Sequence, residues 1–544
     1  MTSTANLAQP SDAPAARRPR ILVADPLSPA GLETLRARAD VEERYPIKPD
    51  ELLAILPEYD ALLVRSGVKV TAKMIEAAAA RLRVIGRAGV GIDNIDVDAA
   101  TQAGIVVVNA PTGNIIAAAE HTIALLLALA RKIPQADASM RRGEWDRHHF
   151  MGIEVQDKVL GTLGLGRIGS LVAARALGLR MKVIAYDPYV SAEYANNLGV
   201  ELVPLDRLLA ESDFITIHLP LNDNTRGLLN AETLARCKRG VRLVNCARGA
   251  IVEEAALLAA LESGQVAGAA LDVYEHEPLA PDDPLRTHPN VVLTPHIAGS
   301  TTEAQERVAI DVIDQVLAIF EGKMAKNAVN VPIVAPQDMD ALSPFIDLAE
   351  RMGRFAAQFE HRNIGRVDLT AHGPIAEYDM AYLVASALKG LLEQVVEERV
   401  NLVNARLIAE RRGIALIEHK QRHHSERYEN MLTLELAAGD ATLTLRGSVV
   451  QGLPYIVAID DLWVSFPAEG YLLLDRHQDR PGVIGRLGAL LGQNDINIAF
   501  MHVGRRERRG EAIMVLGLDE PVPPDVMAQI AAMPYTYWVK FVEL

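Results

Sequence analysis

The feature that most constrains the fold of this chain is a glycine-rich turn between an apolar run and a helix-forming run. Residues 158–187 read KVLGTLGLGRIGSLVAARALGLRMKVIAYD, with Gly164 and Gly166 after a predicted strand and Gly169 in the first turn of a predicted helix at 168–179. Glycines at this spacing permit a tight turn, close approach of the backbone to a pyrophosphate, and close packing of the helix on the strand. The sequence therefore predicts a doubly wound parallel sheet that binds a dinucleotide.

Asp187, at the end of the next predicted strand, indicates which dinucleotide binds. A carboxylate at this place hydrogen-bonds the ribose hydroxyls and repels a 2′-phosphate. The N-terminus of the intervening helix would present free N–H groups and its positive dipole end to the pyrophosphate. We therefore expect NAD as the cofactor.

The pattern of short apolar runs and helical stretches continues on both sides of this turn, which predicts an α/β fold with parallel sheets. A uniformly apolar stretch at 114–131 predicts a buried helix, and the three prolines in 327–344 suggest a linker. Residues 345–466 mix helix and strand. Residues 471–544 follow the βαββαβ order of a ferredoxin-like domain. The strands predicted before this C-terminal part are 21–24, 61–65, 84–86, 106–109, 159–163, 182–186, 214–218, 242–245, 268–272 and 291–294.

Composition indicates which partners and which cellular location the chain is expected to have. The 544 residues carry a formal net charge of −15 and two cysteines, Cys237 and Cys246. The acidity argues against a nucleic-acid partner, and so few cysteines suit a reducing, cytoplasmic location. No apolar run approaches the roughly 20 residues of a membrane span, and no cluster of residues predicts a metal site. Residues 1–19 are expected to be a disordered tail, with an organellar transit peptide as the alternative.

Three polar residues follow three successive predicted strands: Arg248 in NCARG, Glu277 in DVYEHEP and His296 in TPHIAGST. An arginine can grip a carboxylate with two parallel hydrogen bonds, a histidine can transfer a proton near neutral pH, and a carboxylate can orient the imidazole. Ligands bind at the carboxyl ends of strands in such sheets. The set predicts hydride transfer between NAD and a small 2-hydroxy acid, although each residue alone would also suit a surface loop or a core.

Together these motifs resemble the D-2-hydroxyacid dehydrogenase family over residues 20–325, with Arg248, Glu277 and His296 matching its catalytic triad. The resemblance implies a Rossmann-type NAD-binding domain, 111–299, inserted in a flavodoxin-like substrate domain, 20–110 and 300–326. It implies that Asp272 lies near the nicotinamide. Further cofactor contacts are implied at Val90, Arg167, Ile168, Leu219, Cys246, Ala247, His296 and Gly299. It implies substrate contacts at Arg65, Ser66, Gly89, Asn114, Arg147 and Arg248.

Trp145 and Arg147, in GEWDRHHFMG, match family positions that reach a neighbouring subunit's cleft. The resemblance therefore implies a homo-oligomer, a dimer or a tetramer, in which Arg147 contacts a phosphate. The alternative for Trp145 is an interface aromatic without a role in substrate binding.

The C-terminal half resembles two regulatory units. Residues 327–467 are similar to the α+β intervening domain of long-form phosphoglycerate dehydrogenases, and 468–544 to the ACT domain. His477, Asp479 and Asn497 match positions that bind L-serine between two subunits, with Asp479 replacing an asparagine of some relatives. The alternative is an interaction domain that has lost its ligand.

The combined resemblance implies NAD-dependent oxidation of 3-phospho-D-glycerate to 3-phosphooxypyruvate, the first step of the phosphorylated route to L-serine, with feedback by L-serine. Two alternatives remain open at this point. One is another enzyme of the family, a glyoxylate or hydroxypyruvate reductase, although those usually lack the appended domains. The other is an NAD-sensing binding protein, because the family's corepressors keep the same core and triad.

Overall fold

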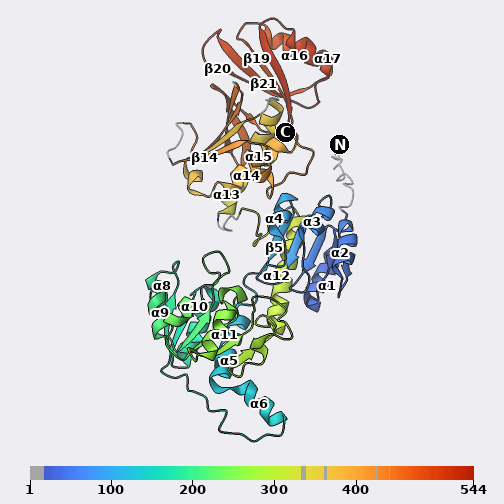
Figure 1. The fold of residues 1–544 in the computed structure, drawn as a ribbon. Helices are drawn as coiled ribbons and strands as arrows, with labels where there is room; N and C mark the ends of the chain where they lie inside the picture. Colours follow the sequence, from blue (N-terminus) through green and yellow to red (C-terminus); the bar gives the residue numbers. More distant parts are fainter. Residues whose placement is uncertain (1–16, 333–337, 360–363, 423–426, 440) are drawn as a thin grey trace, which may run out of the picture.

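A computed structural model describes residues 17–332, 338–359, 364–422, 427–439 and 441–544. In this part of the chain the strands form four sheets, which follow one another along an elongated molecule (Figure 1). Two parallel sheets, blue and green in Figure 1, lie at one end, and the two C-terminal sheets, orange and red, lie at the other. Of the expected N-terminal tail, residues 1–16 lie outside the described residues.

The first sheet is parallel and has the order β2-β1-β3-β4-β5, which is the flavodoxin-like order that was expected. Helix α12 returns to this sheet from far along the chain, because its residues Val308, Val312 and Val316 pack in one cluster with Ile21 and Leu63. The elements are β1 (Arg20–Val23), α1 (Pro29–Arg38), β2 (Asp40–Glu43), α2 (Pro49–Ile55), β3 (Ala61–Val64), α3 (Ala72–Ala78), β4 (Val84–Arg87), α4 (Val97–Gln102), β5 (Val106–Asn109) and α12 (Thr302–Phe320).

The second sheet is parallel with the order β12-β11-β10-β9-β6-β7-β8, so the predicted doubly wound sheet is confirmed. Helix α5 covers it with a buried row that includes Leu125, Leu126 and Leu129. The elements are α5 (Ile115–Arg131), α6 (Ile133–Arg141), β6 (Val159–Leu163), α7 (Arg167–Gly178), β7 (Lys182–Tyr186), α8 (Ala192–Asn197), β8 (Glu201–Leu202), α9 (Leu205–Glu211), β9 (Phe214–Ile217), α10 (Ala231–Arg236), β10 (Val241–Asn245), α11 (Glu254–Glu262), β11 (Val266–Leu271) and β12 (Val291–Leu293).

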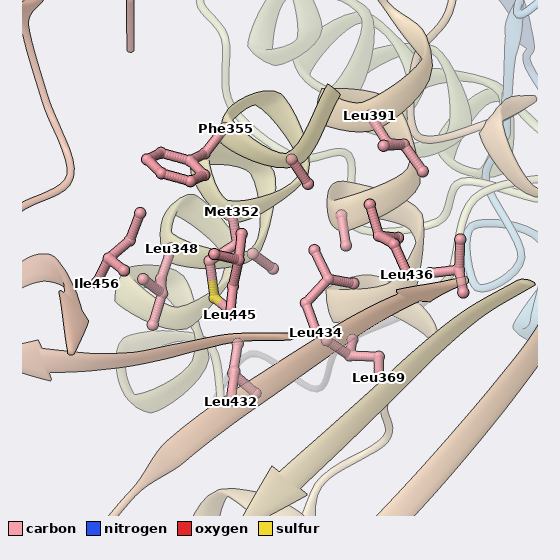
Figure 2. Packing of buried hydrophobic residues seen from close by; sticks show 14 of the residues in the cluster. Leu348, Met352, Phe355, Leu369, Leu391, Leu432, Leu434, Leu436, Leu445 and Ile456 are labelled. Carbon is pink, nitrogen blue, oxygen red and sulfur yellow. The ribbon is translucent and has the colours of Figure 1, made fainter. Parts of the chain in front are cut away.

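The third sheet has the order β14-β13-β15-β16-β17-β18 and is covered by two long helices. Figure 2 shows Leu348 and Met352 of α13 beside Leu445 of the sheet, and all three belong with Phe355 and Leu434 to one buried cluster. The elements are α13 (Met339–Phe359), β13 (Arg366–His372), α14 (Ala381–Leu392), α15 (Ala405–Arg411), β14 (Ala415–Gln421), β15 (Met431–Ala438), β16 (Ala441–Val450), β17 (Leu453–Ile459) and β18 (Leu462–Pro467).

The fourth sheet has the order β20-β21-β19-β22 and the βαββαβ connectivity predicted for a ferredoxin-like domain. One face packs on its own helices, with Leu487, Leu491 and Ile530 buried. The other face joins the core of the third sheet, because Leu472 and Val515 belong to that cluster. The elements are β19 (Tyr471–Gln478), α16 (Val483–Gln493), β20 (Ile498–Arg505), β21 (Glu511–Leu518), α17 (Pro524–Ala531) and β22 (Thr536–Glu543).

Three details differ from the sequence-based expectations, and one is that the two-residue strand β8 was not predicted. The linker predicted at 327–344 is shorter, because α13 already begins at Met339 and holds Pro344 inside the helix. Strand β2, with the polar sequence DVEE, was not predicted, and it pairs with β1 at the edge of the first sheet. Within the described ranges, every helix is too short or too polar to cross a membrane.

Candidate active site

A cavity of about 560 Å³ lies between the two parallel sheets. Both sheets point the carboxyl ends of their strands toward it, which is where ligands bind in open α/β sheets. Arg248 and His296 therefore meet in one space although they follow different strands. The expected site residues that line the cavity are Arg65, Ser66, Gly89, Val90, Asn114, Ile168, Leu219, Cys246, Ala247, Arg248, His296 and Gly299.

His296 and Glu277 form the polar pair expected from the sequence. Nδ1 of His296 lies 2.6 Å from Oε2 of Glu277, and the backbone N–H of Tyr274 donates to Oε1 of the same carboxylate at 3.1 Å. Burial alone would raise the pKa of Glu277, but the hydrogen bond and the charge of His296 outweigh burial and lower it. With Nδ1–H donating to an ionised Glu277, Nε2 of His296 is left to exchange a proton with a substrate.

The backbone of His296 is left-handed, with φ of 54°. This conformation costs roughly 1–2 kcal/mol for a residue with a side chain, so contacts around the loop must hold it. Asp272 supplies two of them: Oδ1 accepts from the N–H of Ile297 at 2.9 Å, and Oδ2 from that of Ala298 at 2.8 Å. Asp272 is itself fully buried, and so it lies behind the loop rather than in the cavity lining.

Arg248 is positioned at the cavity wall by the carboxylate of Asp93, and Gly91 leaves room for its guanidinium. Its Nε lies 3.2 Å from Oδ2 of Asp93, and its Nη1 donates to the carbonyl of Ala247 at 2.7 Å. A Cβ added to Gly91 would lie 2.3 Å from Nη2 of Arg248, so a larger residue at Gly91 would displace the guanidinium. These contacts leave the guanidinium facing the cavity.

Arg87, at the end of β4, is a cavity residue that the sequence reasoning missed. It lines the cavity together with Arg65 and Arg248, and its buried Nε has no hydrogen-bond partner among the described residues. Burial, followed by the charge of Arg248, lowers the pKa of Arg87 to about 10, while Asp93 acts in the opposite direction. A buried cation without a matched acid favours an anionic ligand. The unusual sequence signal was an arginine ending an otherwise apolar strand, VIGR.

The glycine turn after β6 has the shape that a dinucleotide needs. Gly164 has φ of 91°, and a Cβ on Gly169 would lie 2.2 Å from the carbonyl oxygen of Gly164, so neither position accepts a side chain. A Cβ on Gly166 would meet nothing within 4 Å, which leaves open space at the N-terminus of α7. Arg167 is the first residue of α7, whose first N–H groups have no partner within the helix. This open, amide-lined turn fits a pyrophosphate.

Asp187 lies beside the same turn. Its Oδ2 accepts from the N–H of Leu165 at 2.8 Å, and its Oδ1 accepts from that of Tyr189 at 2.9 Å. A carboxylate has about four acceptor sites, so both oxygens can still accept from ribose hydroxyls. The Asp187 carboxylate thus links the glycine turn to the end of β7 by hydrogen bonds. The end of this strand is also the position predicted for Asp187 from the sequence.

Trp145 and Arg147 lie outside the cavity of their own chain, on the segment after α6. Both side chains are exposed, and Trp145 is 75% exposed. Exposed apolar neighbours on and beside α6 include Ile133, Met140 and Met151. An indole this accessible is unusual in a monomer surface and fits a contact with another chain.

The expected effector residues occupy two ends of the fourth sheet. His477 is the next-to-last residue of β19 and is buried, with Nδ1 3.1 Å from a carboxylate oxygen of Asp475. Asp479 lies just beyond it and pairs with Arg505 at 2.6 Å. Asn497 precedes β20 at the opposite end, where its Nδ2 donates to Asp519 at 2.6 Å. Within one chain these three residues do not converge on a single point.

Three family models match the chain. The D-isomer specific 2-hydroxyacid dehydrogenase NAD-binding domain matches residues 123–298, the D-3-phosphoglycerate dehydrogenase intervening domain matches 341–460, and the ACT domain matches 471–534. The first match covers the glycine turn, Arg248, Glu277 and His296.

Similar proteins extend over nearly the whole chain. A D-3-phosphoglycerate dehydrogenase of Synechocystis sp. is 45% identical over 94% of this chain and 92% of its own, and one of Archaeoglobus fulgidus is 44% identical over 96% and 100%. Among solved structures, a glyoxylate reductase from Paecilomyes thermophila has a TM-score of 0.53 and 33% identity, covering 57% of this chain and 98% of its own. That reductase is similar only over part of this chain, whereas the two dehydrogenases span both C-terminal units.

Proposed function

Because the chain belongs to the D-3-phosphoglycerate dehydrogenases of the D-isomer specific 2-hydroxyacid dehydrogenase family, we propose that it oxidises 3-phospho-D-glycerate to 3-phosphooxypyruvate with NAD, the first step of the phosphorylated route to L-serine. The observation that carries the proposal is that His296, hydrogen-bonded to Glu277, lines a cavity that also contains Arg65, Arg87 and Arg248. This cavity combines a proton acceptor with an excess of cations, as an anionic hydroxy acid requires.

The arginines can divide the charges of such a substrate between them. Arg248 is oriented by Asp93 and suits the carboxylate, because a guanidinium binds a carboxylate through two parallel hydrogen bonds. Arg65 and Arg87 lie on the other sheet's side of the cavity and suit the phosphate. Binding there would compensate the buried charge of Arg87. Three more of the expected contacts, Ser66, Gly89 and Asn114, also line the cavity.

His296 would act as the general base of the oxidation. NAD, bound on the glycine turn, supplies the hydride acceptor. As C2 of the substrate loses its hydrogen as a hydride, Nε2 of His296 takes the proton of the C2 hydroxyl, and the alcohol becomes a ketone. Glu277 stabilises the resulting imidazolium through Nδ1. In the reverse direction the same nitrogen returns the proton.

We further propose how the chain is divided and assembled. Residues 20–110 and 300–326 would bind substrate, and 111–299 would bind NAD; the packing of α12 on the first sheet supports this division. Residues 327–467 and 468–544 would be regulatory. A homo-oligomer is supported by the exposed Trp145 segment, through which Arg147 would reach a neighbouring subunit's cavity. The two free cysteines suit a reducing, cytoplasmic location.

L-serine is the proposed effector, bound by His477 and Asp479 of one chain and Asn497 of another. The placement of these residues at opposite ends of the sheet supports a site shared between two chains. Isothermal titration calorimetry of the intact protein with L-serine tests this proposal, with D-serine as the control. Heat from L-serine alone is expected. Equal heats from both enantiomers, or none from either at millimolar concentration, would contradict it.

The dehydrogenase proposal is tested with a panel of 2-hydroxy acids assayed with NAD and full-length protein. We expect NADH formation with 3-phospho-D-glycerate to exceed that with D-glycerate, glycolate or D-lactate. Arg87→Lys keeps the charge and loses the guanidinium fork, so it should raise KM for the phosphorylated substrate. Equal or better turnover of glycolate would instead identify a reductase of the glyoxylate type. NAD binding without turnover of any acid would identify a binding protein.

A further inference from the structure

Helix α5 brings an ionisable side chain, His121, to the back of the catalytic loop. His121 lies on the second turn of the helix, with its side chain 19% exposed. Its Nε2 is 3.2 Å from Oγ1 of Thr294 and 3.4 Å from Oδ1 of Asp272. None of these three atoms belongs to a residue that lines the cavity, although Asp272 is itself expected to lie near the nicotinamide.

Asp272 is the centre of this cluster. Its Oδ1 accepts from the Thr294 hydroxyl at 2.5 Å and from the N–H of Ile297, while its Oδ2 accepts from the N–H of Ala298. A fully buried carboxylate keeps its charge only when donors surround it. Burial would raise the pKa of Asp272, but His121, Thr294 and the two amides together lower it. His121 is therefore one of four donors that keep this carboxylate ionised.

The carboxylate in turn determines the conformation of the loop that carries His296. The loop begins at Thr294, passes through the left-handed His296, and continues into Ile297 and Ala298, whose amides Asp272 binds. Thr294 is also held from the other side, because the hydroxyl of Tyr274 donates to its carbonyl at 2.8 Å. If Asp272 became neutral, its oxygens would accept these hydrogen bonds less strongly, and the loop would lose its restraint.

We infer that His121 is a positioning residue for catalysis: through Asp272 it holds the loop that aims His296 at the substrate. The inference rests on the proposed role of His296 as the general base. His121 does not touch the substrate, and its effect passes through one carboxylate and two backbone amides. A 1 Å displacement of a catalytic group can cost about 10²-fold in rate, so the restraint matters for turnover.

Other titratable groups also face this cluster from each neighbouring element. Cys246 follows β10, Tyr274 and Glu277 follow β11, and His296 follows β12. Asp272 raises the pKa values of Cys246 and Tyr274, for both of which burial is the larger cause. Burial of Cys246 raises its pKa to about 12, so its thiol stays neutral near pH 7. Unlike these groups, His121 contacts Asp272 from helix α5.

The test compares His121→Leu, which removes the donor, with His121→Gln, which keeps a donor near the position of Nε2. In full-length protein with 3-phospho-D-glycerate and NAD, His121→Leu should lower kcat about 10- to 100-fold with little change in KM. Loss of a donor raises the pKa of Asp272, so the acid limb of the kcat–pH profile should move to higher pH. His121→Gln should restore most of kcat.

A second measurement does not depend on activity. Hydrogen–deuterium exchange of the peptide covering 294–300 in the ligand-free protein should be faster in His121→Leu than in wild type, and should return toward wild type in His121→Gln. The inference is overturned if exchange of this peptide is unchanged, or if kcat falls equally at every pH and in both variants. Failure of wild type to oxidise the substrate would refute the proposed function instead, and the exchange result would still report on the loop.

Discussion

At the scale of single residues, the site combines what a sequence pattern can indicate with what only the fold can. Arg248, Glu277 and His296 could be predicted because each follows an apolar strand in a chain with a dinucleotide motif, and two of them line the same cavity. Arg87 could not, because an arginine at a strand end usually reaches solvent. Only the packed structure shows that its Nε is buried and has no hydrogen-bond partner in the part of the chain that the structure describes.

His296→Gln should lower kcat by about 10²–10⁴-fold, because the general base is lost. The binding of NADH should persist, since the glycine turn and Asp187 are unaffected. Stopped-flow turnover and NADH fluorescence titration measure the two effects. His276→Gln is the matched control, because His276 is an exposed histidine two residues after Tyr274 and should leave turnover near normal. A His296→Gln enzyme with wild-type turnover would remove His296 from the mechanism.

Asp187→Ala should weaken NAD binding and narrow the preference for NAD over NADP. The carboxylate accepts from ribose hydroxyls and repels a 2′-phosphate, so its loss removes both effects. The Leu165 and Tyr189 amides would also lose their acceptor, so a thermal melt should accompany the assay. Comparing kcat/KM for the two cofactors gives the preference. A wild-type enzyme that prefers NADP would show that Asp187 has another role.

At the scale of elements, periodicity predicted the apolar strands well and the polar or interrupted elements poorly. Strand β2, DVEE, has no apolar alternation and is defined by its pairing with β1. Helix α13 contains Pro344, which argues for a linker in the sequence, yet its buried face, with Leu348, Met352 and Phe355, stabilises the helix against the third sheet (Figure 2). Tertiary packing decides such elements, and local sequence does not report it.

Strand β19 provides a pH-dependent prediction. Burial would lower the pKa of His477, but its hydrogen bond and charge interaction with Asp475 raise it above the ordinary 6.5. A histidine with a raised folded pKa adds stability that is fully present below its unfolded pKa and is lost as pH rises through the folded value. The contribution of His477 to the melting temperature should therefore decline from about pH 6.5 upward.

Differential scanning calorimetry of wild type and His477→Gln between about pH 5 and pH 8 measures this contribution. The difference in melting temperature should be largest at low pH and should shrink as pH rises. His502→Gln is the control, because His502 is an exposed histidine on β20 of the same sheet, and this variant should track wild type. A pH-independent difference for His477→Gln would mean that the ring is neutral in the folded protein.

At the scale of the whole molecule, the four sheets do not correspond to four independent cores. The third and fourth sheets share one apolar cluster, to which Leu474, Ile513 and Val542 contribute from the C-terminal side. The described residues of the first two sheets form clusters that contain nothing beyond Val331. The sequence predicted the third and fourth sheets as separate segments of the chain. It gave no sign that the two sheets share a core.

Two truncations test the shared core. A chain ending at residue 467 should lose melting temperature and bind a hydrophobic dye, because it uncovers the face that Leu474 and Val515 cover. Exposing each such side chain costs about 1.5–3 kcal/mol. A chain ending at residue 332 removes the shared core entirely and should remain folded, with NADH binding intact. A 467-residue chain that melts like the full-length protein would show that the two sheets fold separately.

The residues expected to bind L-serine lie at two opposite ends of one sheet, and this placement has a further consequence. Asn497 precedes the pairing of Ile498 with Leu518, whereas His477 pairs with Ala512 at the other end. If one ligand needs both, it bridges two chains, and its binding is then linked to association by mass action. Dilution would weaken the response to serine before it affected the chemistry within each cavity, and serine would in turn tighten the pairing of chains. The protein's own concentration would thereby become part of the regulatory signal.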